Sequence, residues 1–175
     1  MRKLAVLIIA LLLPSLLVAT ELEWSPSVAA EAAYKADGLQ DYTSSSFQTG
    51  IVLEPLSMEI DGRHNLSLPF SVYYSTIGNE INYERKQDEV IFSLEARYSY
   101  RFTELFSLGA GAGIKGQWHL GTRYLSASAG GSIVPAFTVL DWLSFSVPVS
   151  VYGSRNDWSM TVGIGCVFHI MEAFR

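Results

Sequence analysis

The chain has 175 residues, of which 49% are hydrophobic and 17% are charged, a composition that excludes a disordered chain and allows one domain with a core. Its formal net charge of -5 disfavours nucleic acid as a partner, because phosphate binding requires clustered basic residues. Its single cysteine, Cys166, cannot form an internal disulfide, so stability has to come from packing and strand pairing.

The first residues have the pattern of an export signal. Met1, Arg2 and Lys3 form a basic tip, and an apolar run follows that is too short to be a spanning helix. We therefore expect residues 1–19 to be a secretory signal peptide and residues 20–175 to form the mature domain. Removal of the signal lowers the count of basic residues from 12 to 10 against 17 acidic ones.

From residue 24 onward, apolar and polar residues alternate with a period of two, as in β-strands with one apolar face. The pattern predicts eight strands, at residues 24–36, 47–55, 66–74, 90–102, 106–118, 124–139, 143–152 and 158–170. A phase slip at Leu56 indicates a bulge, and Asp61-Gly62 indicates a tight turn. We expect longer connections after the first and third strands than after the second, fourth and sixth.

The strands have the features of a membrane barrel rather than a soluble sandwich. They exceed the roughly 5–6 residues usual in soluble sheets and reach the about 9–11 needed to cross a bilayer obliquely. The polar faces of the last four strands consist of Ser, Gly and Thr, with Lys115 almost the only charge. A water-exposed face would carry more charges, whereas small residues suit the interior of a narrow barrel.

Aromatic residues gather near the strand ends, as in the girdles of outer-membrane barrels. One rim would hold Trp24, Tyr100, Phe102, Phe106, Phe137, Trp142 and Phe168, and the other Tyr34, Phe47, Trp118, Tyr124 and Trp158. The predicted fold class is therefore all-β, an eight-stranded antiparallel up-and-down transmembrane β-barrel after an N-terminal signal peptide. An even number of strands returns both termini to one side, and short turns indicate that this side is the periplasm.

With these features the chain resembles the small eight-stranded outer-membrane barrels of Gram-negative-type bacteria, the class that includes the OmpX, OmpW and OmpA transmembrane-domain families. The resemblance rests on the signal peptide, the girdle aromatics and the alternating segment 106–113, and it spans about residues 24–174. One difference lies at the end, where such barrels finish on an aromatic residue but Arg175 here follows Phe174. The resemblance implies outer-membrane lipid and the β-barrel assembly machinery as partners.

Candidate chemistry is sparse in the sequence. Gly109, Gly111 and Gly113 lack the helix that a phosphate-binding loop requires, so we interpret them as making room for large side chains opposite. The histidines, at position 64 in a predicted turn, 119 in an outer loop and 169 in the interior, lack metal-ligand spacing. We therefore expect no metal and no cofactor.

Some small outer-membrane barrels modify lipid A, and each type of these enzymes has its own set of catalytic residues. The deacylase type uses a His-x-Ser pair, whereas His64 and His119 are followed by Asn-Leu and Leu-Gly. The palmitoyltransferase type uses His, Asp and Ser near the outer rim; His119 fits that height, but no triad is evident around it. We therefore expect no catalytic site.

The inward charges form the main candidate site. We predict a lumenal charged network that makes the barrel rigid, because buried charges require partners. Its predicted members are Glu31, Lys35, Glu54, Glu95, Arg97, Arg101 and Lys115. A second candidate is an interaction surface in the charged loop 77–90, which contains Glu80, Glu84, Arg85, Lys86 and, among its other charges, Glu89.

These observations predict an integral outer-membrane protein with both termini in the periplasm and a structural role or a narrow, porin-like passage for small solutes. The first alternative is a surface protein that acts in adhesion or host interaction through its extracellular loops. The second alternative is a lipid-A-modifying enzyme. The small size of the predicted loops disfavours the first, and the missing His-x-Ser pair disfavours the second.

Overall fold

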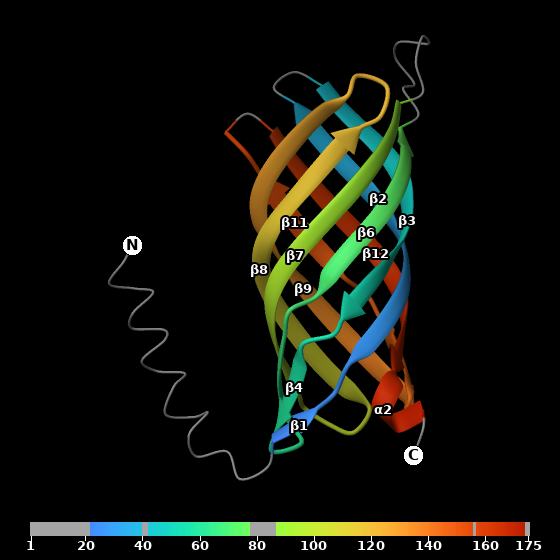
Figure 1. Ribbon diagram of the computed structural model, residues 1–175, viewed down its shortest axis with the longest axis vertical. Coiled ribbons are helices and arrows are strands. Elements are labelled where there is room, and N and C mark those ends of the chain that lie inside the picture. The colour runs from blue at the N-terminus through green and yellow to red at the C-terminus, as the bar shows by residue number, and fades with distance from the viewer. Residues whose placement is uncertain (1–21, 40–41, 78–86, 156, 174–175) are drawn as a thin grey trace, which may run out of the picture.

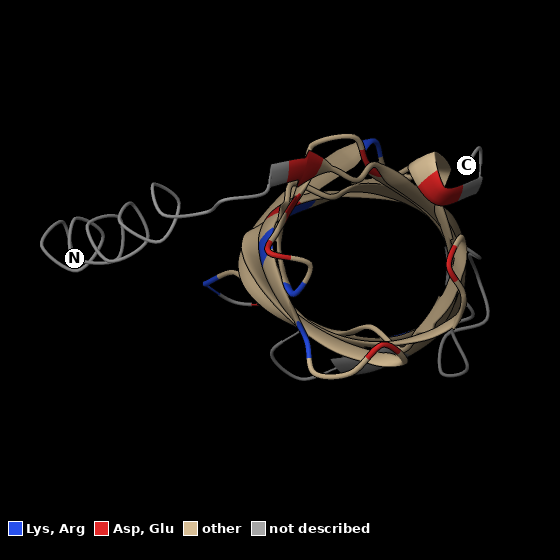
Figure 2. Cartoon of the chain, turned by 90° about the horizontal axis from the view of Figure 1, so that it is seen from below, with Lys and Arg blue, Asp and Glu red and all other residues tan. Residues whose placement is uncertain are grey.

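The computed structural model describes residues 22–39, 42–77, 87–155 and 157–173. One antiparallel sheet closes on itself into a barrel with eight walls, each wall being one crossing of the barrel (Figure 1). Viewed along its axis, the ribbon forms a complete ring (Figure 2). The predicted fold class is confirmed for the barrel, and the predicted signal peptide lies outside the described residues.

Each wall consists of one or two strands. Four walls are single strands: β7 (Gln87–Arg101), β8 (Phe106–His119), β9 (Tyr124–Leu140) and β12 (Asp157–His169). Four walls are pairs: β1 (Leu22–Trp24) with β2 (Ser27–Leu39), β3 (Tyr42–Glu54) with β4 (Ser57–Ile60), β5 (His64–Ser67) with β6 (Phe70–Ile77), and β10 (Leu143–Ser146) with β11 (Val149–Gly153). A short helix, α2 (Ile170–Ala173), follows β12.

Prolines lie in the breaks of the divided walls. A proline has no backbone N–H to donate to the ladder, so regular pairing stops there. The four breaks contain Pro26, Pro55, Pro69 and Pro148. Backbone bonds continue across them: Leu68 N donates to Leu56 O at 2.9 Å, and Gly163 N to Pro148 O at 2.9 Å. The prediction of unbroken strands was wrong here, and the predicted bulge at Leu56 is a break.

The barrel closes between its first and last walls. β12 pairs with β2 without a register shift, from Asp157 opposite Leu39 to His169 opposite Ser27. This pairing removes both free edges of the sheet. β1 and α2 consequently lie at the same end of the barrel, which we call the terminus end, and the opposite end is the loop end (Figure 1).

The connections agree with the prediction in part. Asp61 (φ 52°) and Gly62 (φ 65°) form the predicted tight turn, where glycine fits the left-handed conformation, and Arg63 N donates to Ile60 O at 3.3 Å. β6 ends at Ile77 and β7 begins at Gln87, a separation that agrees with the predicted longer connection after the third strand. The predicted long first connection was wrong, because only residues 40–41 separate β2 from β3.

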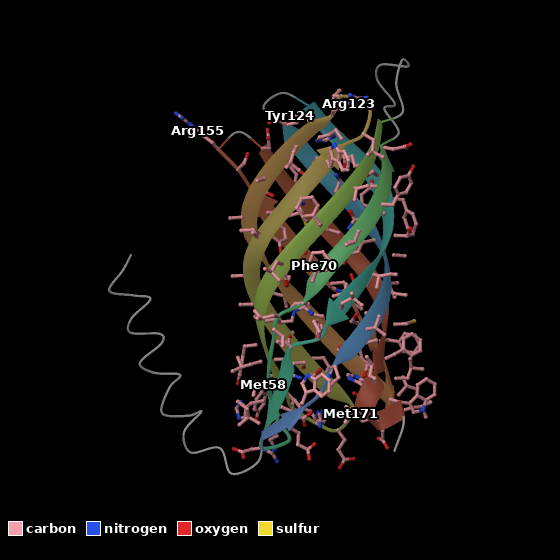
Figure 3. All side chains as sticks on the ribbon, viewed as in Figure 1. Met58, Phe70, Arg123, Tyr124, Arg155 and Met171 are labelled. Carbon is pink, nitrogen blue, oxygen red and sulfur yellow. The ribbon has the colours of Figure 1, made fainter. Side chains whose placement is uncertain are left out.

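The two faces of the sheet differ as predicted. Large apolar side chains point outward, such as Ile164 and Ile114, which are 65% and 64% exposed. Polar side chains point inward and are buried, including Lys35 and Ser75, both 0% exposed. Side chains extend from both faces of the ribbon along the whole barrel (Figure 3). No helix in the described part of the chain is long and apolar enough to cross a membrane.

Exposed aromatic side chains form a girdle near each end of the barrel, as predicted. The terminus-end girdle includes Trp24, Phe102, Phe137, Trp142 and Phe168, and the loop-end girdle Tyr34, Phe47, Trp118, Tyr124 and Trp158. Neighbouring rings touch at the terminus end, where Tyr100 and Phe102 have centroids 4.9 Å apart. Such belts suit the boundaries between hydrocarbon and water.

The outward face of β12 provides a test of the face assignment. Ile164 lies near the middle of that strand, so Ile164→Arg should lower the free energy of unfolding by about 2–4 kcal/mol, because a guanidinium is costly in the bilayer midplane. The measurement is guanidinium chloride unfolding of protein refolded into lipid vesicles. Asp141→Arg, in an exposed turn, is the control, and equal losses in both variants would contradict the assignment.

Candidate functional site

The inward charged side chains lie in three groups along the lumen. The central cluster consists of Glu31, Glu54, Tyr73, Glu95, Arg97, Ser132 and Tyr152. The loop-end cluster consists of Lys35, Asp37, Glu89, Lys115, His119 and Ser159. The terminus-end pair is Arg101 with Glu59. The sequence analysis grouped Lys35, Lys115 and Arg101 with Arg97; none of the three is paired with a carboxylate of the central cluster in the described part of the lumen.

Arg97 lies at the middle of the central cluster. Its Nη1 lies 2.8 Å from Glu54 Oε1, and its Nη2 lies 3.1 Å from Glu95 Oε2. Glu54 ends β3 whereas Arg97 and Glu95 belong to β7, so the guanidinium connects two walls that are not sheet neighbours. Charge-assisted bonds of this kind are the stronger class of hydrogen bond, and the bond to Glu54 joins different walls of the barrel.

Hydroxyl groups also donate hydrogen bonds to two carboxylates of the central cluster, Glu95 and Glu31. Glu95, only 6% exposed, accepts hydrogen bonds from Ser132 Oγ at 2.7 Å and from the Tyr152 hydroxyl. Glu31 accepts one from the Tyr73 hydroxyl. The cluster thus contains three carboxylates and one guanidinium, with tyrosine and serine hydroxyls as the additional donors. A buried carboxylate requires such partners, because it has lost its hydration.

Glycines on β8 make room for the central cluster. A Cβ atom on Gly109 would lie 3.3 Å from Arg97 Cδ and 2.7 Å from Ser99 Oγ. A Cβ atom on Gly111 would lie 2.9 Å from Glu95 Oε2. The predicted role of these glycines, space for large side chains on the neighbouring strand, is confirmed at both positions.

The loop-end cluster contains the most deeply buried charges. Lys35 Nζ lies 2.6 Å from Glu89 Oε2 and 2.8 Å from Asp37 Oδ2, and Lys35 and Glu89 are 0% and 1% exposed. His119 Nδ1 lies 2.7 Å from Glu89 Oε1. The sequence analysis assigned Glu89 to a charged loop and His119 to an outer loop; both assignments were wrong, because β7 begins before Glu89 and β8 extends to His119.

Within the loop-end cluster, Lys115 is the residue that contacts the central cluster. Its ammonium group donates to Ser159 Oγ and lies 5.1 Å from the centroid of the Tyr152 ring. The Tyr152 hydroxyl in turn donates to Glu95. A cation over an aromatic face is electrostatically favourable. Tyr152 therefore contacts Lys115 through its ring and Glu95 through its hydroxyl.

The terminus-end pair is more open to water. Arg101 Nη1 lies 3.2 Å from Glu59 Oε1, and the Arg101 side chain is 46% exposed. Exposed pairs contribute little to stability because solvent screens them. Close to this end, His169 Nε2 lies 3.0 Å from Ser144 Oγ, and Ser144 is 3% exposed. The predicted interior position of His169 is confirmed by this contact.

Two small cavities lie in the lumen. One of about 120 Å³ lies in the terminus half, with Arg101, His169 and Ser144 in its wall. The other, of about 50 Å³, is lined by Tyr73, Glu95 and Tyr152. Arg97 and Glu31 contribute to the walls of both cavities, so the central cluster lies where they meet. These volumes suit a few water molecules.

The sequence analysis missed several members of these clusters. Asp37 and Glu59 have the inward parity of their strands, so the alternation alone could have identified them. Tyr73 and Tyr152 also lie at inward positions of the alternation, and nothing in the sequence indicates that they contact carboxylates. The predicted loop surface of Glu80, Glu84, Arg85 and Lys86 lies outside the described residues. No group of three or more His, Cys, Asp or Glu side chains among the described residues could hold a metal ion.

Comparisons with known proteins agree with the architecture. The chain is similar to Neisserial surface protein A (NspA), with 16% identity and a TM-score of 0.60 over 85% of this chain and 99% of that chain. It is also similar to the attachment invasion locus protein Ail of Yersinia pestis, with 15% identity and a TM-score of 0.51 over 83% of this chain and 98% of that chain.

A third similar structure is the outer membrane enzyme PagL, with 15% identity and a TM-score of 0.56 over 81% of this chain and 99% of that chain. No protein-family model matches the chain, and no curated protein matches it in sequence. At these identities the similarity concerns the fold alone. The chain therefore has the fold of the small eight-stranded outer-membrane β-barrels.

Proposed function

We propose that the protein is an integral outer-membrane protein with a structural role. In this proposal the side chains inside the barrel block its lumen, and the protein has no catalytic site. The observation that carries this proposal is the ion-paired central cluster, in which Arg97 pairs with Glu54 of another wall and with Glu95 of its own strand. The apolar outer face and the two aromatic girdles support a membrane location, since such a surface is stable in hydrocarbon and insoluble in water.

The structural role is favoured over a narrow passage for small solutes. A solute that crossed the lumen would have to separate Arg97 from its carboxylates and Lys35 from Glu89. Barrels of about eight strands have interiors that side chains can fill, and the small cavity volumes agree with this. A passage would therefore require a rearrangement of both clusters.

The absence of catalysis is part of the same proposal. The deacylase-type signature is missing from the sequence, and His119, the histidine at the height of the outer rim, faces Glu89 inside the barrel. Ser144 contacts His169 within the terminus half of the lumen, but its 3% exposure leaves little access for a substrate. These contacts support a role in packing for both histidines.

We further propose that the terminus end faces the periplasm, that residues 1–19 are a cleaved signal peptide, and that the β-barrel assembly machinery inserts the chain. β6 ends and β7 begins at the loop end, with residues 78–86 between them in the sequence, and long loops are typical of the extracellular side. The connection between β2 and β3, residues 40–41, is too short to indicate which side of the membrane the loop end faces. The proposed orientation therefore rests on the length of the segment 78–86 and on the position of β1 and α2 at one end of the barrel.

The membrane proposal predicts that the protein is recovered from the outer-membrane fraction of expressing cells and that the refolded barrel is silent in planar lipid bilayers. No unitary conductance is expected, because the central cluster occupies the lumen. Regular current steps of the wild-type protein would contradict the closed lumen. Recovery from the periplasm as a monomer free of detergent would contradict the membrane location.

The central cluster predicts a specific loss of stability. Arg97→Ala should reduce the free energy of unfolding by about 3 kcal/mol, because it leaves the buried Glu95 and the partly buried Glu54 without their cation. The midpoint and slope of guanidinium chloride unfolding in lipid vesicles measure this loss.

Two further variants make the test of Arg97 specific. Arg155→Ala, at an exposed position near the loop end (Figure 3), is the matched control and should leave the midpoint unchanged. Arg97→Met combined with Glu54→Gln and Glu95→Gln should recover most of the lost stability, since it removes the charges together. An unchanged midpoint in Arg97→Ala would show that the cluster does not stabilise the barrel.

A further inference from the structure

The lipid-facing surface of the barrel contains an apolar hollow of about 880 Å³. We call it the outer hollow. It lies over β4, β5, β7 and β8, and its lining includes Leu56, Met58, Leu68, Ala96, Tyr98 and Ala112. The outer hollow shares no space with the lumenal cavities, because the sheet lies between them.

Small side chains on two adjacent walls produce the outer hollow. On the outer face, one cross-strand row runs from Met58 through Leu66 and Tyr98 to Ala110. In the next row, Ala96 of β7 lies opposite Ala112 of β8. Large side chains on β4, β5 and β7 thus border small ones, and the surface is hollowed where Ala96, Ala110 and Ala112 lie side by side.

The outer hollow is confined to the terminus half of the barrel. Leu94 and Ile114 lie opposite each other on β7 and β8 and line a second, smaller hollow of about 500 Å³ toward the loop end. Phe70, which also lines the second hollow, lies near mid-height, whereas Met58 lies close to the terminus end (Figure 3). The outer hollow therefore spans about the depth of one leaflet.

Polar groups lie at the terminus-end margin of the outer hollow. Trp24 lines it and donates its indole N–H to Pro55 O at 2.9 Å. The hydroxyl of Tyr98, another lining residue, lies 2.6 Å from His64 Nδ1. An apolar floor with polar groups at one end matches a molecule that has a hydrocarbon tail and a polar head.

We propose that the outer hollow binds an acyl chain of a phospholipid from the leaflet at the terminus end, with its headgroup near Trp24, Tyr98 and His64. This inference rests on the proposed membrane location. The occupant is a lipid rather than a second copy of the chain, because two identical hollows that face each other across a twofold axis leave the space between them empty. The apolar lining is also continuous with the surface that faces hydrocarbon.

The test fills the hollow with a larger side chain. Ala112→Phe and Ala110→Phe point outward into the hollow, where a phenyl ring suits a lipid environment and occupies the space of the acyl chain. Wild-type protein, reconstituted in nanodiscs of phosphatidylethanolamine and phosphatidylglycerol, is released into native mass spectrometry. We expect a monomer that retains one phospholipid, and a retained fraction about tenfold lower in each variant.

The matched control is Ala32→Phe, an outward alanine on β2 that lies away from both hollows and adds the same apolar side chain. It should retain lipid as the wild type does. Equal retention in all variants, no retained lipid in the wild type, or a lipid-free dimer would overturn the inference. Heat-modifiable gel migration verifies that each variant is folded, and outer-membrane fractionation separates a failure of lipid binding from a failure of the proposed membrane location.

Discussion

The backbone hydrogen bond in hydrocarbon is the constraint on which this structure depends. Lipid offers no donors or acceptors, so each backbone group within the membrane requires a partner in the chain. Closure of the sheet between β12 and β2 meets this requirement at the edges. The proline breaks test it locally, and the bonds from Leu68 N to Leu56 O and from Gly163 N to Pro148 O keep the ladder connected. At these breaks a neighbouring wall provides the backbone bond that keeps the sheet continuous.

The same closure accounts for the chemistry of the interior. A narrow barrel leaves a lumen in which charged side chains lose much of their hydration, so they lie where another wall supplies a partner. Arg97 meets Glu54 from another wall, and Lys35 meets Glu89. The glycines of β8 belong to this arrangement, because Gly109 and Gly111 leave the volume that the side chains of Arg97 and Glu95 occupy. The polar interior and the apolar exterior thus both result from the alternation of polar and apolar residues along each strand.

The alternation predicted the eight walls, their faces and the girdles, because the period of two is a local property of the chain. The breaks at Pro55 and Pro69 were missed because bonds across a break depend on the register of neighbouring walls. Glu89 and His119 were misassigned because strand ends, unlike strand centres, carry a weak pattern. The partition of the lumenal charges into separate clusters depends on strand stagger, which no single strand encodes. The contacts of Tyr73 and Tyr152 with carboxylates of the central cluster could not be predicted for the same reason.

The pairing of the first wall with the last also has a consequence for biosynthesis. β2 and β12 lie at opposite ends of the sequence, so their contacts have nearly the largest separation that the chain allows. Such non-local contacts form slowly, and here they cannot form before the ribosome has released the final strand. A half-made polypeptide would present two unpaired edges and a row of apolar residues to water, the combination that favours aggregation. The order of synthesis thus leaves the apolar outer face and both edges of the sheet without their final partners until the last wall is made.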